Sequence, residues 1–430
     1  RRSHQGTDID LTVRLTTLDN GFRIVTEPMP GLQSAAIGVW VLAGARHETA
    51  GQNGIAQFLE HMAFKGTATR SALDIAEALE DVGGYINAYT SREVTAYYAR
   101  VLGEHVTLAL DVVADILRQP VFAPSEIEIE RGVILQEIGQ ALDTPDDFIF
   151  DWLQEKAYPD HPLGRAILGA EERVQNFSRA DLTEFVSQHY RPGQMILSAS
   201  GAVDHDELVR AAEALFGDMA GASETVAPTA RFAGGESRTV KSLEQAHFAL
   251  AFESPDYCDP SIYTAHISAS ALGGSLSSRL FQEVREKRGL CYTIYAQAGA
   301  YCDTGMMTIY AGTSGAQMPD LAQITIDEMK RAANDLSEAE LDRARAQMKA
   351  GLLMGLESPS HRAERLARMI QIWGRVPELQ EVVDRIDAVT LGDLRNMAET
   401  TISQAPAARA LYGPVETAPT LEALQDRRAA

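Results

Sequence analysis

The stretch Gly54–Thr67, with the sequence GIAQFLEHMAFKGT, constrains this chain more than any other segment. It is mostly apolar and holds no Gly or Pro between Ile55 and Lys65, so it predicts a buried helix. Glu60 and His61 come three and four residues after Gln57, which places an amide, a carboxylate and an imidazole on one helix face. Burying such groups without partners costs about 2–7 kcal/mol each, and more for a charge. The stretch therefore predicts a polar site built on a buried helix.

The spacing of these polar residues is close to the H-x-x-E-H helix of inverted zinc proteases, with Gln57 in place of the first His. A hydrolytic zinc ion takes about three protein ligands and leaves one position for water. A nearby carboxylate that is not a ligand takes the proton of that water. In this interpretation Gln57 and His61 occupy ligand positions and Glu60 is the general base. The other interpretation is a buried polar pair in which Glu60 and His61 satisfy each other.

A third ligand must come from another element, and the helix that begins at Pro124 offers two candidates. Its apolar pattern continues to about Leu142. Glu130 and Glu137 are seven residues apart, which is two turns and one face. Glu137 has apolar neighbours, so its carboxylate would need a cation if it is buried. An ordinary surface glutamate is the alternative for Glu137.

The composition is that of a globular protein, with 430 residues, 45% hydrophobic and 23% charged, and the length favours two or more domains. The formal net charge of −22 argues against general nucleic-acid binding, which depends on basic patches. It favours either plain solubility or an acidic cavity that attracts basic peptides. No G-x-S-x-G, P-loop or G-x-G-x-x-G pattern supports another catalytic class.

The three cysteines are odd in number and form no C-x-x-C pair, which makes a disulfide framework or a cysteine zinc site improbable. This favours a reducing compartment, and we expect a cytoplasmic protein. The longest apolar run, from Ala35 to Ala45, is too short to cross a bilayer. No signal-peptide pattern opens the chain.

The sequence predicts two duplicated halves, separated at residues 218–235 by a segment of small, polar and turn-forming residues. The order helix, Gly, strand, strand, helix at Ser71–Leu117 recurs in the second half, where a helix is predicted over Ser278–Lys287. We predict an α+β fold, each half a mostly antiparallel sheet covered by helices. The predicted domains are 11–220, with the site helix, and 236–430.

Several separate motifs, in the right order, resemble the pitrilysin/insulinase family of metallopeptidases, in the branch of the mitochondrial processing peptidase β subunit and its bacterial relatives. The resemblance covers the chain from about residue 12 to the end of the second half. The matching segments are Gly54–Thr67, Asn87–Glu93 (NAYTSRE), Glu130–Ile138 (ERGVILQEI), His161–Gly169 (HPLGRAILG) and Ser278–Tyr292 (SRLFQEVREKRGLCY).

The resemblance implies a zinc cofactor and a role for each matching residue in the first half. His61 and Glu137 match the second and third zinc ligands, and Gln57 stands at the first ligand position. Glu60 matches the general base. Glu130 matches an acid that orients a ligand.

The resemblance also implies a peptide substrate. The strand with Asn87 and Ala88 matches an edge that pairs with the substrate backbone, which suits peptides cut with loose sequence preference. Arg285 and Tyr292 match a pair that holds the peptide and stabilises the tetrahedral oxyanion. A surface arginine and a strand tyrosine are the alternative for these two.

In the family, the duplicated halves form a clamshell, and members of this length form dimers that enclose a chamber. We therefore expect a homodimer, or a mixed dimer with a related chain, that admits short or unfolded peptides. No nucleic acid and no membrane span are expected.

Gln57 departs from the family pattern, because a neutral amide oxygen is a poor zinc ligand beside imidazole. Three interpretations are open. The residue is an introduced substitution that traps substrate or blocks self-digestion, a natural residue in an enzyme with weakened metal binding, or the mark of a natural non-catalytic partner chain. Non-catalytic chains of processing peptidases carry a long Gly-rich loop in the second half, whereas only Gly273-Gly274-Ser275 is found here. That favours the catalytic lineage.

Overall fold

The computed structural model describes residues 12–221, 226–403 and 406–429, and the chain packs into two compact units. The first unit combines residues 1–135, 167–226 and 354–376, and the second combines 136–166, 227–353 and 377–430. Residues 1–11, on which the expectation of no signal peptide rests, lie outside the described part of the chain.

The first unit is built on a six-stranded sheet with the order β1-β2-β6-β3-β5-β4. All neighbours are antiparallel except β2 and β6, which are parallel. Strand β3 is almost entirely buried because both faces of the sheet are covered. The strands are β1 (Arg14–Thr17), β2 (Arg23–Pro28), β3 (Ser34–Val41), β4 (Tyr85–Thr90), β5 (Thr95–Leu102) and β6 (Met195–Gly201).

The second unit repeats this topology in a five-stranded sheet with the order β7-β11-β8-β10-β9. It again has one parallel pair, β7 and β11, and three antiparallel pairs. The prediction of an α+β fold in two duplicated halves is therefore confirmed. The strands are β7 (Gly235–Val240), β8 (Ala246–Ser254), β9 (Cys291–Ala300), β10 (Gly305–Thr313) and β11 (Ala407–Gly413).

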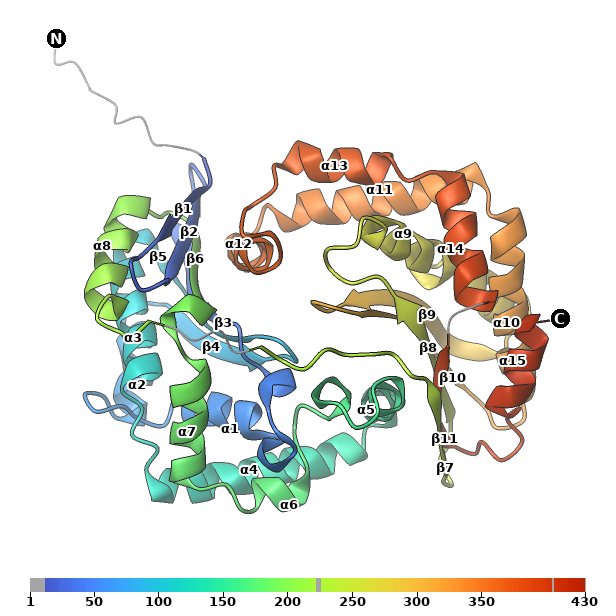
Figure 1. Cartoon of the computed structure of the whole chain (residues 1–430), viewed down its shortest axis with the longest axis horizontal. Helices are drawn as coiled ribbons and strands as arrows, with labels where there is room; N and C mark the ends of the chain where they lie inside the picture. The colour runs from blue at the N-terminus through green and yellow to red at the C-terminus, as the bar shows by residue number, and fades with distance from the viewer. Residues whose placement is uncertain (1–11, 222–225, 404–405, 430) are drawn as a thin grey trace, which may run out of the picture. The chain divides into compact units, whose positions relative to one another are not determined.

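Helices cover both sheets, as the ribbon in Figure 1 shows for each unit. The first unit holds α1 (Ile55–Met62), α2 (Ala72–Glu80), α3 (Val106–Arg118), α6 (Glu171–Val174), α7 (Arg179–His189), α8 (His205–Phe216), α12 (Pro359–Trp373) and the start of α4 (Pro124–Leu142). The second unit holds the end of α4, α5 (Pro145–Ala157), α9 (Ile262–Gly273), α10 (Met318–Asp335), α11 (Glu338–Gly355), α13 (Leu379–Asp387), α14 (Leu391–Ser403) and α15 (Leu421–Ala429).

The two units exchange one covering element each, which a division of the chain at residues 220–236 does not anticipate. Helix α12, from the second half of the sequence, packs its apolar face on the first sheet, against Val25, Trp40 and Ile196. Helix α5, from the first half, packs Ile149 and Leu153 on the second sheet, as part of a cluster with Ala249, Ala251, Ala408 and Ala410. Each core therefore contains side chains from both halves of the sequence.

Two predicted helices differ from the observed ones. Helix α1 ends at Met62 instead of near Lys65, and the chain then reaches Gly66 at a φ of 114°. The helix predicted over Ser278–Lys287 contains a π-helix, Phe281–Glu286, in which the N–H of Lys287 donates to the carbonyl of Gln282 at 2.9 Å. Hydrophobic periodicity does not distinguish such a wider turn from an α-helix, because both bury the same apolar residues.

Within residues 12–221, 226–403 and 406–429, no helix has both the length and the apolar character needed to span a bilayer.

Candidate active site

Helix α1 starts at a close approach between two glycines. Gly54, the residue before α1, has a φ of 99°, and a Cβ there would lie 2.9 Å from the Cα of Gly169. Gly169 has a φ of 86°, and a Cβ there would lie 2.5 Å from the Cα of Gly54. Only glycine fits both the left-handed backbone and the short separation. The end of the segment His161–Gly169 thus supports the start of the site helix.

A buried carboxylate, Glu48, caps α1 because Gly54 has no side chain to do so. Its oxygens accept the backbone N–H groups of Gly54 and Ala56, each at 3.0 Å, and the amide N–H of Asn53 at 3.2 Å. Glu48 is only 2% exposed. A negative charge at a helix N-terminus is favoured by the helix dipole as well as by these hydrogen bonds.

The structure shows the polar face that was predicted for α1. The five apolar residues of the helix are buried, whereas Gln57, Glu60 and His61 are partly exposed. The amide nitrogen of Gln57 lies 3.3 Å from Nε2 of His61. The residues predicted for the first two ligand positions are therefore in direct contact.

Glu130 orients the imidazole of His61 and is itself neutralised by a lysine. Its carboxylate accepts from Nδ1 of His61 at 3.0 Å and from Nζ of Lys65 at 2.7 Å. Because the carboxylate accepts, Nδ1 of His61 holds the proton, and Nε2 accepts from the amide of Gln57. Glu130 is only 5% exposed, so it is the buried carboxylate that needs a cation, a condition considered above for Glu137.

Arg131, the residue after Glu130, fixes α4 against α1. Its guanidinium lies 5.7 Å from the ring centroid of Phe58 on α1. It also donates to the carbonyls of Val174 and Phe177, the latter at 2.7 Å. These contacts set the rotation of α4 about its axis and so direct the neighbouring Glu130 toward His61.

Glu60 lies near a pair of buried phenols. The hydroxyls of Tyr97 and Tyr190 are 2.7 Å apart. Burial, together with the smaller effect of the negative charge of Glu60, raises the pKa of Tyr97 well above its ordinary value and contributes to a pKa of about 12 for Tyr190. Both phenols therefore stay neutral at physiological pH beside the candidate base.

The residues present do not fit a resident zinc ion. Among the described residues, no group of three or more His, Cys, Asp or Glu side chains is arranged to hold a metal. At the two positions on α1, the lone pair of His61 Nε2 faces the amide of Gln57. An amide is a weak donor for zinc, which prefers imidazole, thiolate and carboxylate.

Glu137 lies two turns beyond Glu130 on α4 and is partly exposed. The helix passes from the first unit to the second between Leu135 and Gln136, so Glu137 belongs to the second unit. Its assignment as the third ligand stays a prediction.

Asn87 and Ala88 lie on β4, which forms one edge of the first sheet. The backbone N–H of Ala88 donates to the side-chain oxygen of Asn87 at 2.8 Å. A peptide that pairs with this N–H would have to displace the Asn87 amide. The role of this edge in substrate binding stays a prediction.

Arg285 and Tyr292 are brought together by the π-helix and β9 in the second unit. The Arg285 guanidinium lies 5.6 Å from the ring centroid of Tyr292, and its Nε donates to the Tyr292 carbonyl at 3.0 Å. The Tyr292 side chain is 78% exposed, whereas the Arg285 side chain is held by the contacts just described. An exposed ring beside a fixed guanidinium is suited to contact a ligand, and that role also stays a prediction.

Glu48 and Lys65 are two site residues that the sequence patterns did not indicate. Lys65 is four residues after His61, so the helix predicted to extend to Lys65 could have suggested it, although the observed α1 ends at Met62. Glu48 had a weaker signal. A helix that starts with Gly54 has no capping side chain of its own, which calls for an acceptor from elsewhere.

The fold and this arrangement are those expected of a duplicated metallopeptidase of the inverted zinc-protease type, with Gln57 at the position predicted for the first ligand. Residues 23–171 match the family model "Insulinase (Peptidase family M16)", and residues 176–348 match "Peptidase M16 inactive domain". The chain belongs to peptidase family M16, the insulinase family, which confirms the resemblance. Gln57, Glu60, His61, Glu130 and Glu137 fall in the first match.

Curated relatives named as zinc proteases are similar to this chain over nearly their whole length. An "uncharacterized zinc protease" of Rickettsia bellii is 38% identical, over 93% of this chain and 97% of the relative. The "uncharacterized zinc protease Rv2782c" of Mycobacterium tuberculosis is 39% identical, over 96% of each. The "uncharacterized zinc protease YmxG" of Bacillus subtilis is 38% identical, over 91% of this chain and 96% of the relative.

Solved structures share the fold. A protease from Helicobacter pylori aligns with a TM-score of 0.86 and 22% identity, over 94% of this chain and 99% of that one. A chain of complex III2 from Candida albicans, solved with Inz-5 bound, aligns with a TM-score of 0.86 and 22% identity, over 97% of this chain and all of that one.

Proposed function

We propose that this chain is a processing-peptidase-like endopeptidase scaffold for short or unfolded peptides, in which Gln57 alone prevents zinc binding. The observation that supports this best is the state of His61. Its Nδ1 proton is held by Glu130, and Glu130 is neutralised by Lys65. This leaves Nε2 as the acceptor, the tautomer that a metal-binding histidine requires. In this chain the side-chain amide of Gln57 faces that lone pair.

The other proposed roles concern the peptide. Asn87 and Ala88 on the β4 edge pair with its backbone, and Arg285 with Tyr292 hold it and stabilise a developing oxyanion. In a form with His at position 57, zinc would supply the Lewis acid and Glu60 would accept the proton of the attacking water. We further propose that the chain works as a dimer, with a copy of itself or with a related chain.

A second candidate function is a non-catalytic, peptide-binding or structural subunit of a mixed dimer. The satisfied contact between Gln57 and His61 favours it, because the pair needs no metal to be stable. In this case Arg285 and Tyr292 would serve the site of the partner chain.

The deciding experiment compares the chain as given with Gln57→His by elemental analysis and by cleavage of unfolded peptides. We expect about one zinc per chain only in Gln57→His, with cleavage that a further Glu60→Gln change abolishes while zinc remains. Gln33→His, a change at an exposed loop position, is the matched control and should bind no stoichiometric zinc.

Two results would contradict the first candidate. If Gln57→His holds no zinc, position 57 is not the single lesion, and the non-catalytic function takes over. If zinc binds but peptides are cut only after a second, complete chain is added, the subunit function is favoured.

A further inference from the structure

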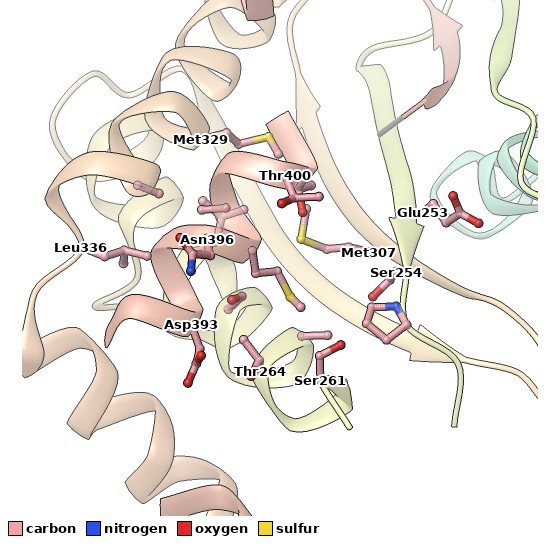
Figure 2. A pocket seen from close by; sticks show the side chains of 18 of the residues that line it. Glu253, Ser254, Ser261, Thr264, Met307, Met329, Leu336, Asp393, Asn396 and Thr400 are labelled. Atoms are coloured by element: carbon pink, nitrogen blue, oxygen red, sulfur yellow. The ribbon is translucent and has the colours of Figure 1, made fainter. Parts of the chain in front are cut away.

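The second unit contains a cavity of about 630 Å³ between α9, α10, α14, the end of β8 and the start of β10 (Figure 2). None of the candidate active-site residues lines it. The volume falls within the range of about 300–1,000 Å³ that is typical of sites for small organic molecules. The cavity therefore needs an explanation separate from peptide cleavage.

Buried side chains from two hydrophobic clusters of the second unit line this cavity. Leu272, Met307 and Met329 belong to the cluster on the second sheet. Ala332 and Leu336 belong to the cluster that also contains residues of α11 and α13. All five are at most 8% exposed, and Figure 2 shows three of them, Met307, Met329 and Leu336, in the lining. Side chains that face an empty space lose dispersion contacts, which an apolar molecule in the cavity would restore.

Small side chains on two helices keep the cavity open. The lining residues of α9 and of α10 are spaced so that each set lies on a single helix face. Ala265 on α9 and Ala332 on α10 lie on these faces and are 3% and 4% exposed. A leucine at either position would extend into the space between the helices. The open space therefore depends on two buried alanines.

The walls of the cavity can adjust to a ligand. Met307 on β10, Met329 on α10 and Met397 on α14 contribute thioethers from three different elements. Methionine side chains are flexible and polarizable, so they adapt to apolar molecules of different shapes. The cavity thus suits a class of apolar compounds.

Two carboxylates of the lining, Asp259 and Asp393, already accept hydrogen bonds inside the protein. Asp259 accepts from the backbone N–H of Ser261 at 2.8 Å and from its hydroxyl at 2.6 Å. Asp393 accepts from the backbone N–H of Thr390 at 2.8 Å and from its hydroxyl at 2.7 Å, as part of the cap of α14. Local hydrogen bonding therefore explains both carboxylates without a ligand.

The other two charged residues of the lining do not call for an ionic ligand either. Arg279 forms ion pairs with Asp335 and Glu340, the latter at 2.6 Å. Glu253 lies on β8, where successive side chains face opposite sides of the sheet. It shares its side with Ala251, which packs in the cluster of α5, so its carboxylate points away from the cavity. A ligand with a charge would thus lose its hydration without gaining a new ion pair.

Uncharged polar side chains lie at the rim of the cavity. Asn396 and Thr400 are four positions apart on α14, line the cavity and are exposed to solvent. The amide of Asn396 and the hydroxyl of Thr400 can each donate and accept a hydrogen bond. They suit an uncharged polar group, such as a hydroxyl, at one end of an apolar molecule.

We propose that this cavity binds a small neutral organic molecule, with an apolar body between the two hydrophobic clusters and one uncharged polar group beside Asn396 and Thr400. The apolar body leaves water and gains contacts with the methionines and leucines of the lining. The polar group stays at the rim, where it can keep its hydrogen bonds.

The test uses the full chain with ¹³C-labelled methionine methyl groups and titration with n-octanol, n-octylammonium and octanoate. We expect n-octanol to shift the methyl signals of Met307, Met329 and Met397, assigned by single Met→Leu variants. The signal of Met318, buried at the start of α10 and outside the lining, should not move. The two charged probes should each bind at least threefold more weakly than n-octanol.

Two variants that fill the cavity and one control make the test specific. Ala332→Leu and Ala265→Leu, on different helices, should each weaken n-octanol binding at least fivefold because the added carbons occupy the space. An unchanged Met318 signal shows that each variant is folded. Ala423→Leu makes the same change at an exposed position of α15 outside the lining, and it should bind as the unchanged chain does.

Four results would overturn the proposal. These are no binding of n-octanol, shifts confined to methionines outside the lining, a charged probe that binds as tightly as n-octanol, or unchanged n-octanol binding in a folded Ala332→Leu or Ala265→Leu variant. The probe series uses the unchanged chain, so it decides the question even if a filling variant does not fold.

Discussion

Glu48 shows at the level of a single residue how much of the site depends on one buried carboxylate. It accepts the two backbone N–H groups that begin α1. Glu48→Ala leaves these buried donors without an acceptor, so we expect the free energy of unfolding to fall by about 1–3 kcal/mol in urea titrations. Glu80→Ala, at an exposed position of α2, should change it by less than about 0.5 kcal/mol. Equal effects of the two changes would show that the cap is not needed.

His47 makes the stability of the first unit depend on pH. Burial, with the neighbouring His189 and Arg46, lowers the pKa of His47 from 6.5 to about 4, and its Nδ1 accepts the N–H of Gly44 at 3.1 Å. Between pH 6.5 and 4 the unfolded chain therefore binds a proton that the folded chain does not.

The stability from this group is complete above pH 6.5 and is lost as the pH falls toward 4, by about 3 kcal/mol in all. Urea unfolding at a series of pH values measures the slope. His47→Asn keeps an acceptor for Gly44 but does not titrate, so its slope over this window should be smaller. An unchanged slope would assign the pH dependence to other groups.

The candidate site could be predicted from the sequence where the residues share one helix. Gln57, Glu60 and His61 were placed on one face of α1 by their spacing alone. Glu130 contacts His61 and Lys65, which lie more than sixty residues away in the sequence. A pattern of neighbouring residues carries no information about which distant residues come into contact. The Glu48 cap was missed for the same reason.

At the scale of elements, α12 is the helix whose placement matters most for the first unit. Its residues Leu366 and Ile370 are buried against the first sheet, and the hydroxyl of Ser198 on β6 donates to the carbonyl of Ala363 at 2.6 Å. We expect Leu366→Ala to lower the unfolding free energy by about 2–5 kcal/mol, because it leaves a cavity in the core.

The matched control for this change is Leu353→Ala, since Leu353 on α11 is 47% exposed. It should cost well under 1 kcal/mol in the same urea titration. If both changes cost the same, α12 does not hold the core as described.

Predicting the elements succeeded where the apolar pattern was strong and failed where composition was ambiguous. The long α4, predicted to run from Pro124 to about Leu142, has those bounds in the structure. Strand β11, with the sequence AARALYG, was missed because alanine favours helices. The π-helix was missed because its wider turn leaves no mark on the hydrophobic period.

At the scale of the whole molecule, the exchange of α5 and α12 predicts that the two halves of the sequence cannot fold alone. A fragment of residues 1–226 lacks α12 and exposes the apolar face of α5. We expect each fragment, 1–226 or 227–430, to be insoluble or unfolded when expressed alone. Co-expression of the two should give a soluble complex that copurifies through a tag on one fragment.

The control for the fragment experiment is the same pair with Leu366→Asp in the second fragment, which places a charge in the core of the first unit. Copurification should then be lost. A well-folded fragment 1–226 on its own, shown by a cooperative thermal transition, would contradict the expectation.

The exchanged helices also set the order of events during synthesis on the ribosome. The first unit needs α12, which ends at Trp373 of a 430-residue chain, so its core stays incomplete until most of the polypeptide has been made. At about 5–20 residues per second, the wait after residue 226 lasts on the order of ten to thirty seconds. During that time the sheet face that α12 will cover is exposed to the cell, and binding by a chaperone would protect it.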